Sequence, residues 1–399
     1  MSSSDEALRV SRASNTHPSR QPSELQVDLD LLTRLVRIRW QTRPKQVERI
    51  PAGLGLRRFY RIELEASDDA PTSVIARLEP PAPLRNAAVR RTSDELASLA
   101  PSWLAEPPLE PLRGFLEDAE LPVPCSYFHD ATLGIDLLED LGDRRLSDLG
   151  PEARETGYRA ACALVPRLQA LTAAPDTIPA FGRVFDAALV ETKAWKWIHW
   201  TLPGLLGRAP RPRERKAIEK GFRLISEGLE KAPRRLAHRD FKAENLLLLG
   251  GDGATDGAAG GAALAMIDVQ GAFLAPPEYD LVCLLCDLQV DLPEPLVQTL
   301  FRETLPSLPD RPSLEEARLR FDQLALLRLC KDVSHVVQAG LERGDARRWP
   351  EIPRGLDLIE GTALRLEHGL PKIRELTSVI QALTREARSS DRRVRERTT

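Results

Sequence analysis

The chain has 399 residues, 42% of them hydrophobic, which is enough to build two lobes with separate cores. Its 56 basic and 59 acidic residues nearly cancel, whereas a protein that binds duplex DNA would carry a strong basic excess. The five cysteines are scattered and odd in number, no apolar run approaches the ~20 residues of a membrane span, and the N-terminus does not resemble a signal peptide. We therefore expect a cytoplasmic protein, with a monomer favoured, that binds neither nucleic acid nor membrane.

The first part of the chain predicts a tail, a helix and a hairpin. Residues 1–25 are rich in Ser, Arg and Pro without periodicity, so we expect them to be disordered. Apolar residues at helical spacing predict an amphipathic helix over residues 29–39. Two strands then flank Gly53 and Gly55, which would let backbone amides approach phosphate oxygens, although an ordinary hairpin turn has the same pattern. The basic Arg57 beside these glycines favours a phosphate-binding loop.

Two further strands are predicted before the chain becomes mainly helical. One covers residues 73–79 and carries Arg77. The other ends in the polar stretch of residues 139–142, Glu-Asp-Leu-Gly. Between these strands, helical spacing predicts helices over residues 84–99 and 109–121.

A cluster of aromatic residues lies at the end of a helix predicted over residues 185–199. Trp195, Trp197 and Trp200 offer flat faces of the kind that bind sugar rings. Three side chains at these spacings cannot all lie on one face of a helix, so we expect at least two of them to pack in the core.

The most informative segment is residues 238–245, His-Arg-Asp-Phe-Lys-Ala-Glu-Asn, which fits the catalytic-loop pattern of kinases. Asp240 is the candidate base, because a carboxylate at this place accepts the proton of an attacking hydroxyl. Asn245 is a candidate ligand for the Mg²⁺ that bridges nucleotide phosphates. Lys242, two residues past the base, is placed as in protein-serine kinases, where it would steady the transferred phosphate.

A second acidic motif follows at residues 266–271, where an apolar run ends in Asp268. A strand that delivers a carboxylate in this way supplies the oxygen ligand that Mg²⁺ prefers. The intervening Gly- and Ala-rich residues 250–263 predict the tip of a hairpin between strands at 246–249 and 264–267. A single Asp would more often cap a helix or a turn. Asp240, Asn245 and Asp268 in this order, however, predict the transfer of a phosphoryl group from ATP with Mg²⁺.

These motifs resemble those of the aminoglycoside phosphotransferase/choline kinase superfamily, the small-molecule relatives of protein kinases. Residues 267–272 and 276–281 have its Ile-Asp-x-Gln-x-Ala and Pro-x-x-Tyr-Asp-Leu pattern in place of Asp-Phe-Gly and Ala-Pro-Glu. Within the superfamily the chain is most similar to bacterial kinases that phosphorylate the anomeric hydroxyl of N-acetylmuramate and N-acetylglucosamine. The likeness also includes residues 57–61, 138–143 and, more weakly, 352–354.

The resemblance implies an α+β, two-lobed protein-kinase-like fold. We expect a small antiparallel-sheet lobe over residues 26–138, a mainly helical lobe over residues 139–384, and a disordered Arg-rich tail over residues 385–399. Asp280 resembles the residue that ties the catalytic loop to the helical lobe, and His238 and Arg239 would brace that loop.

The resemblance also implies how the nucleotide is held. Arg77 occupies the position of the usual phosphate-contacting lysine, but its guanidinium is larger, planar and bidentate. Either Arg77 or the pair Arg57 and Arg58 contacts the phosphates, or nucleotide affinity is poor. We take Glu110 as the acidic partner on the following helix, although a solvated surface carboxylate has the same appearance. The predicted nucleotide-binding residues are Gly53, Gly55, Arg57, Arg77, Glu139 and Leu141, the last two through backbone atoms.

The sequence therefore predicts a small-molecule kinase whose acceptor carries a hydroxyl group. An amino sugar is the first choice of acceptor, and an aminoglycoside or another amino alcohol is the second. A pseudokinase or an ATP-binding regulatory module remains open because of Arg77. Protein kinase activity is disfavoured, since the Asp-Phe-Gly and Ala-Pro-Glu segments are missing.

Overall fold

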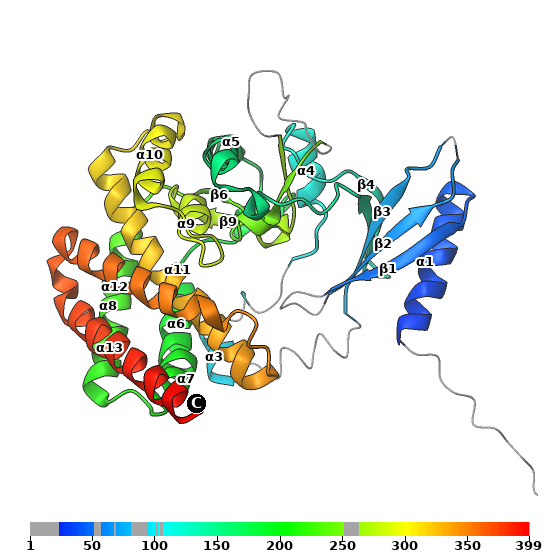
Figure 1. The fold of residues 1–399 in the computed structure, drawn as a ribbon. Coiled ribbons are helices and arrows are strands. Elements are labelled where there is room, and N and C mark those ends of the chain that lie inside the picture. Colours follow the sequence, from blue (N-terminus) through cyan, green and yellow to red (C-terminus); the bar gives the residue numbers. More distant parts are fainter. Residues whose placement is uncertain are drawn as a thin grey trace, which may run out of the picture.

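The computed structural model describes residues 24–51, 57–67, 69–80, 94–100, 103, 107–250 and 263–398. The described chain forms two lobes, a small one built on a sheet and a larger helical one (Figure 1). This is the α+β, two-lobed fold that the sequence predicts. Gly53, Gly55 and most of the predicted N-terminal tail lie outside the described residues.

The small lobe is a five-stranded antiparallel sheet with one helix against it. In spatial order its strands are β1 (Pro44–Ile50), β2 (Arg58–Leu64), β3 (Ser73–Leu78), β5 (Ile135–Glu139) and β4 (Ser126–Asp130). Buried and half-buried residues alternate along β2, as expected for a sheet with one fully covered face. That face packs on α1 (Glu24–Trp40) through a core that includes Val36, Tyr60 and Leu137. The opposite face is left to line the cleft between the lobes.

The larger lobe is organised around α11 (Leu314–Arg343), whose side chains from Phe321 to Cys330 are all buried. This helix contacts α6, α8, α9 and α12. The helices of the lobe are α5 (Pro151–Gln169), α6 (Ala187–Lys196), α7 (Leu202–Leu206), α8 (Pro212–Leu229), α9 (Tyr279–Leu285), α10 (Glu294–Thr304), α12 (Ile352–Gly369) and α13 (Arg374–Thr398). Two short helices from the connection between β3 and β4, α3 (Asp94–Leu99) and α4 (Leu112–Asp118), lie against the same lobe.

Two small antiparallel ribbons carry the sequence motifs. In the first, β6 (Arg235–Ala237) pairs with β9 (Phe273–Ala275), and in the second, β7 (Leu246–Leu248) pairs with β8 (Leu264–Met266). The second ribbon is the hairpin that the sequence predicts. The catalytic loop, residues 238–245, therefore connects β6 to β7, and Asp268 follows the end of β8.

The C-terminal segment differs from its prediction. The expectation of disorder was wrong over residues 385–398, because α13 continues as a helix to Thr398. Residues 374–399 contain neither Gly nor Pro and are rich in Arg and Glu, which favour helix. The helix is anchored by Leu376, Ile380 and Leu383, which are buried in the core of the larger lobe.

Two predicted helices have different limits in the structure. The helix predicted over residues 109–121 is confined to α4, directly after Pro111. The helix predicted over residues 185–199 begins with an N-cap, because the Asp186 carboxylate accepts a 2.8 Å hydrogen bond from the Leu189 N–H. It continues beyond α6 as one π-helical turn over Trp197–Thr201. Among the described residues, no helix combines the length and the apolar character needed to cross a membrane.

Candidate active site

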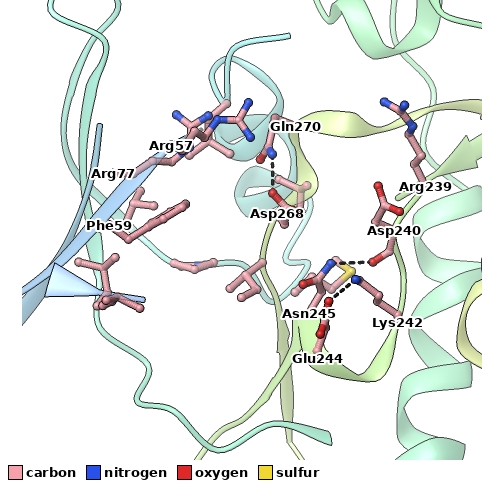
Figure 2. Close-up of a pocket in the computed structure, with 18 of the residues that line it drawn as sticks. Arg57, Phe59, Arg77, Arg239, Asp240, Lys242, Glu244, Asn245, Asp268 and Gln270 are labelled. Carbon is pink, nitrogen blue, oxygen red and sulfur yellow. Dashed lines mark hydrogen bonds and ion pairs between the residues drawn. The ribbon is translucent and has the colours of Figure 1, made fainter. Parts of the chain in front are cut away.

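A cleft of about 1760 Å³ lies between the two lobes. One wall is the free face of β2, β3 and β5. The other wall consists of the catalytic loop, the end of β8 and the facing sides of α6 and α11. Figure 2 shows Arg57 and Arg77 on the first wall and Asp240, Asn245 and Asp268 on the second, all bordering the same space.

The catalytic loop is anchored by Asp280, which lies in the first turn of α9. Its carboxylate accepts hydrogen bonds from the backbone N–H groups of His238, at 2.7 Å, and Arg239, at 3.1 Å. Burial raises the pKa of Asp280 to about 6, against the opposing effect of His238 and these hydrogen bonds. Arg239 has a φ of 81°, a left-handed conformation that is uncommon for any residue with a side chain. Asp280 therefore has the anchoring position that the resemblance implies.

Asp240 faces the cleft among positive charges. Its carboxylate lies 3.1 Å from the guanidinium of Arg328 and 3.8 Å from the ammonium of Lys331, both on α11. Burial by itself would raise the pKa of Asp240, but Lys331, Arg328, Arg239 and Lys242 outweigh it and hold that pKa well below its usual range. The carboxylate is consequently ionised and can accept a hydrogen bond from a hydroxyl group at neutral pH.

Asn245 and Asp268 are brought together by the two strands of the β7–β8 ribbon. The amide nitrogen of Asn245 donates to the Asp240 carbonyl at 2.9 Å, and the backbone C=O of Asn245 accepts from the Ile267 N–H at 3.0 Å. Asp268 has a φ of 63° and accepts a 2.5 Å hydrogen bond from the Gln270 amide. A left-handed residue other than glycine costs roughly 1–3 kcal/mol, and such strain is concentrated at functional sites.

The donor set of this pair fits Mg²⁺. With the Asn245 amide nitrogen engaged by the Asp240 carbonyl, its oxygen is the atom that a metal ion could use, and Asp268 adds a carboxylate. Mg²⁺ is commonly held by one or two protein oxygens together with nucleotide phosphates and water. The described residues contain no cluster of three or more His, Cys, Asp or Glu side chains that could hold a metal ion by themselves. A shared site with a nucleotide is therefore the arrangement that these residues suit.

Lys242 reaches the cleft but is not free of partners. Its ammonium forms an ion pair with Glu244, three-quarters buried beside it (Figure 2). Burial lowers the pKa of Lys242, but Glu244 and Asp240 more than compensate and raise it overall. Lys242 is thus charged and held at the edge of the site.

On the opposite wall, Arg77 is buried and doubly paired. Its guanidinium lies 2.6 Å from Asp136 on the neighbouring strand β5 and 2.5 Å from Glu79. Arg57 also contacts Glu79, at 2.9 Å. The other oxygen of Asp136 lies 2.6 Å from Nδ1 of His129 on β4. A row of paired side chains therefore crosses the sheet and faces the cleft.

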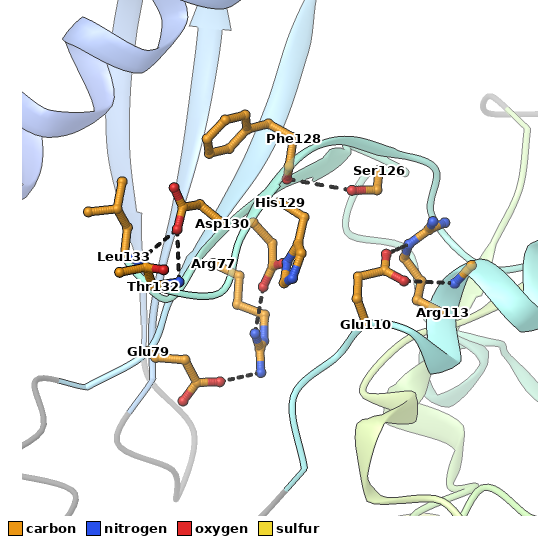
Figure 3. A network of polar contacts seen from close by, with 12 residues as sticks. Arg77, Glu79, Glu110, Arg113, Ser126, Phe128, His129, Asp130, Thr132 and Leu133 are labelled. Atoms are coloured by element: carbon orange, nitrogen blue, oxygen red, sulfur yellow. Dashed lines mark hydrogen bonds and ion pairs between the residues drawn. The ribbon is translucent and has the colours of Figure 1, made fainter. Parts of the chain in front are cut away.

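The predicted pair between Arg77 and Glu110 is not formed. Glu110 instead forms an ion pair with Arg113 and accepts a 3.0 Å hydrogen bond from the Gly114 N–H. In Figure 3 Glu110 and Arg113 lie together, apart from Arg77 and Glu79. Glu110 precedes α4, which packs on the larger lobe, and this connection keeps it away from the sheet.

The connection between the lobes follows β5. The Glu139 N–H already donates to the Cys125 carbonyl at 2.9 Å, whereas both Glu139 and Leu141 border the cleft. Arg61 on β2 secures this connection through ion pairs with Asp140 at 2.8 Å and Asp143 at 2.5 Å. The apolar side chains that line the cleft nearby are Phe59, Ile75, Leu138, Leu247 and Met266.

Comparison with known proteins identifies the family. The profile of the phosphotransferase enzyme family matches residues 46–317 of this chain, from β1 to the start of α11. The chain belongs to the phosphotransferase enzyme family. The recognition made from the sequence motifs is thereby confirmed, and the enzyme is a small-molecule kinase.

Two curated relatives of this phosphotransferase are N-acetylmuramate/N-acetylglucosamine kinases. The one from Pseudomonas aeruginosa is 25% identical over 291 residues, which cover 70% of this chain and 80% of the relative. The one from Neisseria meningitidis is 26% identical over 253 residues, which cover 61% of this chain and 71% of the relative.

Solved structures with the same fold include aminoglycoside phosphotransferases. ADP-bound APH(2'')-Ib has a TM-score of 0.52 at 11% identity, covering 88% of this chain and 99% of that chain. The gentamicin complex of APH(2'')-IIa has a TM-score of 0.51 at 12% identity, covering 82% and 95%. At these identities the likeness establishes the kinase-like fold.

One part of the phosphotransferase cleft lies beside Asp240 and is lined by α6 and α11. Lys193 and Lys196 extend from α6, and Lys331, Asp332 and His335 extend from α11. Because Lys331 lies 3.8 Å from Asp240, we expect an acceptor whose hydroxyl reaches Asp240 to contact this surface. We call these five residues the acceptor wall.

The structure places one of the three tryptophans in the core, whereas the sequence predicts at least two. Trp197 is buried in the core of the larger lobe. Trp195 and Trp200 are half-buried and contact each other edge to face, with ring centroids 5.6 Å apart. Trp200 also lies against His335, at the back of the acceptor wall. None of the three lines the cleft in the described structure.

Sequence reasoning missed the residues that set the charge of the site. Asp136 and Arg328 were not singled out, although each is a charged residue in an otherwise apolar segment. A charge within such a segment is rarely buried without a partner, and that pattern was the available signal. Arg328 is 4% exposed and, besides Asp240, it contacts Asp332 and the Arg239 carbonyl.

Proposed function

We propose that this enzyme transfers the γ-phosphoryl group of ATP, together with Mg²⁺, to a hydroxyl group of an amino sugar of the N-acetylmuramate or N-acetylglucosamine type. The main support is the convergence of Asp240, Asn245 and Asp268 on one cleft, in the order that phosphoryl transfer requires. The names of the two curated relatives support the choice of acceptor.

The chemistry follows from positioning and charge. Asp240 orients the acceptor hydroxyl and receives its proton as the phosphoryl group leaves ATP. Because its pKa is held low, this carboxylate is a weak base, so the proton moves late, which suits a loose transition state. Bound Mg²⁺ would neutralise charge on the phosphates, and Asn245 and Asp268 would hold it. Lys242 and Arg77 lie where they can stabilise the remaining negative charge of the phosphates.

The charge of the acceptor wall favours an amino sugar over an aminoglycoside. The acceptor wall has three lysines, Lys193, Lys196 and Lys331, but a single carboxylate. That carboxylate, Asp332, also forms an ion pair with Arg328. A polycationic aminoglycoside would meet like charges there and would find few carboxylates to bind. A neutral or negatively charged acceptor would meet no such repulsion.

The experiment that tests this proposal is incubation with labelled ATP and Mg²⁺ over a panel of amino sugars, aminoglycosides, amino alcohols and generic protein acceptors. We expect label to enter N-acetylmuramate or N-acetylglucosamine at the anomeric position. Transfer only to aminoglycosides or amino alcohols would favour the second choice. Calorimetric binding of MgATP without turnover on any acceptor would instead favour the regulatory-module alternative that Arg77 raises.

A further inference from the structure

Two lysines of the acceptor wall lack a negatively charged partner. Lys193 is 4% exposed, and within the described chain its ammonium has no hydrogen bond or ion pair. The direct contacts of the Lys196 ammonium within the described chain are with uncharged groups, Nε2 of His335 at 3.1 Å and the ring of Trp200, whose centroid is 5.5 Å away. Lys193 is buried and Lys196 is half-buried, and an ammonium that is removed from water without a counter-charge is costly. This pair of side chains therefore indicates a function.

The neighbouring carboxylates are already engaged. Asp332 lies 2.8 Å from Arg328 and 3.1 Å from Lys331. Asp240 lies near the same two cations. Within the described residues neither carboxylate forms an ion pair with the α6 lysines. A negatively charged group that enters through the open side of the cleft would therefore supply a counter-charge that these lysines lack.

We propose that Lys193 and Lys196 form a subsite for a carboxylate carried by the acceptor, beside the hydroxyl that Asp240 receives. This inference rests on the proposed function, which puts the acceptor between Asp240 and α6. A carboxylate at this point supplies the missing charge and accepts charge-assisted hydrogen bonds from the ammonium groups. N-acetylmuramate carries such a group on its lactyl ether, and N-acetylglucosamine is the same sugar without it. The subsite therefore selects N-acetylmuramate.

The protonation of these lysines supports the subsite. Burial, with Lys331 and Arg239 nearby, lowers the pKa of Lys196 to about 7. Burial, with Lys331 and Arg328 nearby, lowers the pKa of Lys193 well below its ordinary value. The charged and titratable groups that face Lys196 are Lys193, Arg239, Lys331, Asp332 and His335. A bound carboxylate favours the protonated amine. Affinity for it is therefore highest below about pH 7 and declines as the pH rises above that value, whereas a neutral sugar lacks this dependence.

The kinetic test compares kcat/KM for the two sugars, using the full chain and MgATP. One charge-assisted contact predicts a preference for N-acetylmuramate of about tenfold or more in the wild type at pH 6.5–7. Lys193→Met and Lys196→Met keep the length of the side chain and remove its charge, so each should reduce this ratio by about tenfold. The matched control is Lys216→Met, at an exposed position of α8, which should leave the ratio unchanged. Equal losses for both sugars in the α6 variants would mean a structural role and would overturn the subsite.

A binding measurement decides the case in which the wild type phosphorylates neither sugar. The proposed function then fails, and D-lactate, the carboxylate fragment of the lactyl ether, becomes the probe. Its binding to the full chain can be followed by tryptophan fluorescence, because Lys196 lies against Trp200. A saturable change that is weakened in both α6 variants, and absent with the uncharged methyl ester, would support the subsite. No saturable change, or equal binding by the variants, would overturn it whichever acceptor the enzyme uses.

Discussion

Arg77 and Asp136 are directly opposite each other on the antiparallel strands β3 and β5, and their side chains form a 2.6 Å ion pair on the cleft face of the sheet. The sequence led us to expect an acidic partner on a helix. The sheet supplies that partner instead, and the register between the two strands fixes the geometry of the pair. Asp136 is thus a positioning residue for the Arg77 guanidinium, which we propose contacts the phosphates.

Asp136→Asn should weaken the binding of MgATP more than it slows turnover. The amide keeps the size of the side chain but removes the charge that orients Arg77, leaving a buried guanidinium with one carboxylate, Glu79. We expect KM for MgATP to rise by about tenfold, equivalent to roughly 1.4 kcal/mol, with a smaller change in kcat. Initial-rate kinetics at several ATP concentrations measure both constants.

Glu110→Gln is the matched control for that experiment. Glu110 pairs with Arg113 rather than with Arg77, so KM for MgATP should change by less than about twofold. An increase in KM as large as that of Asp136→Asn would show that the helix supplies the partner after all, and it would remove the role assigned to the β3–β5 pair.

Asp240→Asn and Asp268→Asn should abolish turnover while the fold remains. Asn is close to isosteric with Asp and tolerates the left-handed backbone at residue 268. Loss of the proton acceptor or of the metal carboxylate should reduce kcat by about 10²–10⁴-fold. Measurements of kcat, together with melting curves followed by circular dichroism, test these two variants. Turnover within tenfold of the wild type in either variant, at an unchanged melting temperature, contradicts the assigned role.

Asp280→Ala should impair catalysis through the loop. It removes the acceptor for two backbone N–H groups, those of His238 and Arg239, and His238 is only 2% exposed. Leaving buried donors unpaired costs about 1–3 kcal/mol each, so both the melting temperature and kcat should fall. The control is Asp291→Ala, which removes a largely exposed carboxylate after α9. If Asp280→Ala retains full activity after correction for folded protein, the anchoring role is refuted.

Lys193→Met should make the protein more stable at neutral pH. The folded-state pKa of Lys193 lies below its unfolded value, so the unfolded state binds more protons, and wild-type stability rises as the pH increases through that interval. Removing the amine should raise the melting temperature at pH 7 by about 2–4 °C, and this gain should shrink towards pH 10. Calorimetry at both pH values, with Lys216→Met for comparison, measures the effect. A lower melting temperature at pH 7 would mean that Lys193 stabilises the fold.

The sequence allowed the fold and the catalytic loop to be predicted because both depend on local patterns. Asp240, Asn245 and Asp268 lie in short motifs with fixed spacing, and the strands on either side of them follow from apolar runs. The partner of Arg77 could not be predicted in this way. It depends on which strands become neighbours, and β3 and β5 are separated by more than fifty residues of chain.

The way in which two helices bring the charges of the acceptor wall together could not be predicted from the sequence either. Lys193 and Lys331 come from helices more than one hundred residues apart, and only packing of α6 against α11 brings them to one surface. The helical tail at residues 385–398 was missed for a different reason. Its Arg-rich composition suggested disorder. The preceding turns of α13 are packed in the core, however, and the helix that they begin continues through residues 385–398.

The strand-to-strand support of Arg77 also has a consequence for control of the enzyme. In a kinase whose phosphate-contacting residue depends on a swinging helix, moving that helix away turns the site off. Here the supporting carboxylate is fixed by backbone pairing and cannot withdraw without breaking the sheet. Displacement of a neighbouring helix would therefore leave the Arg77–Asp136 pair intact.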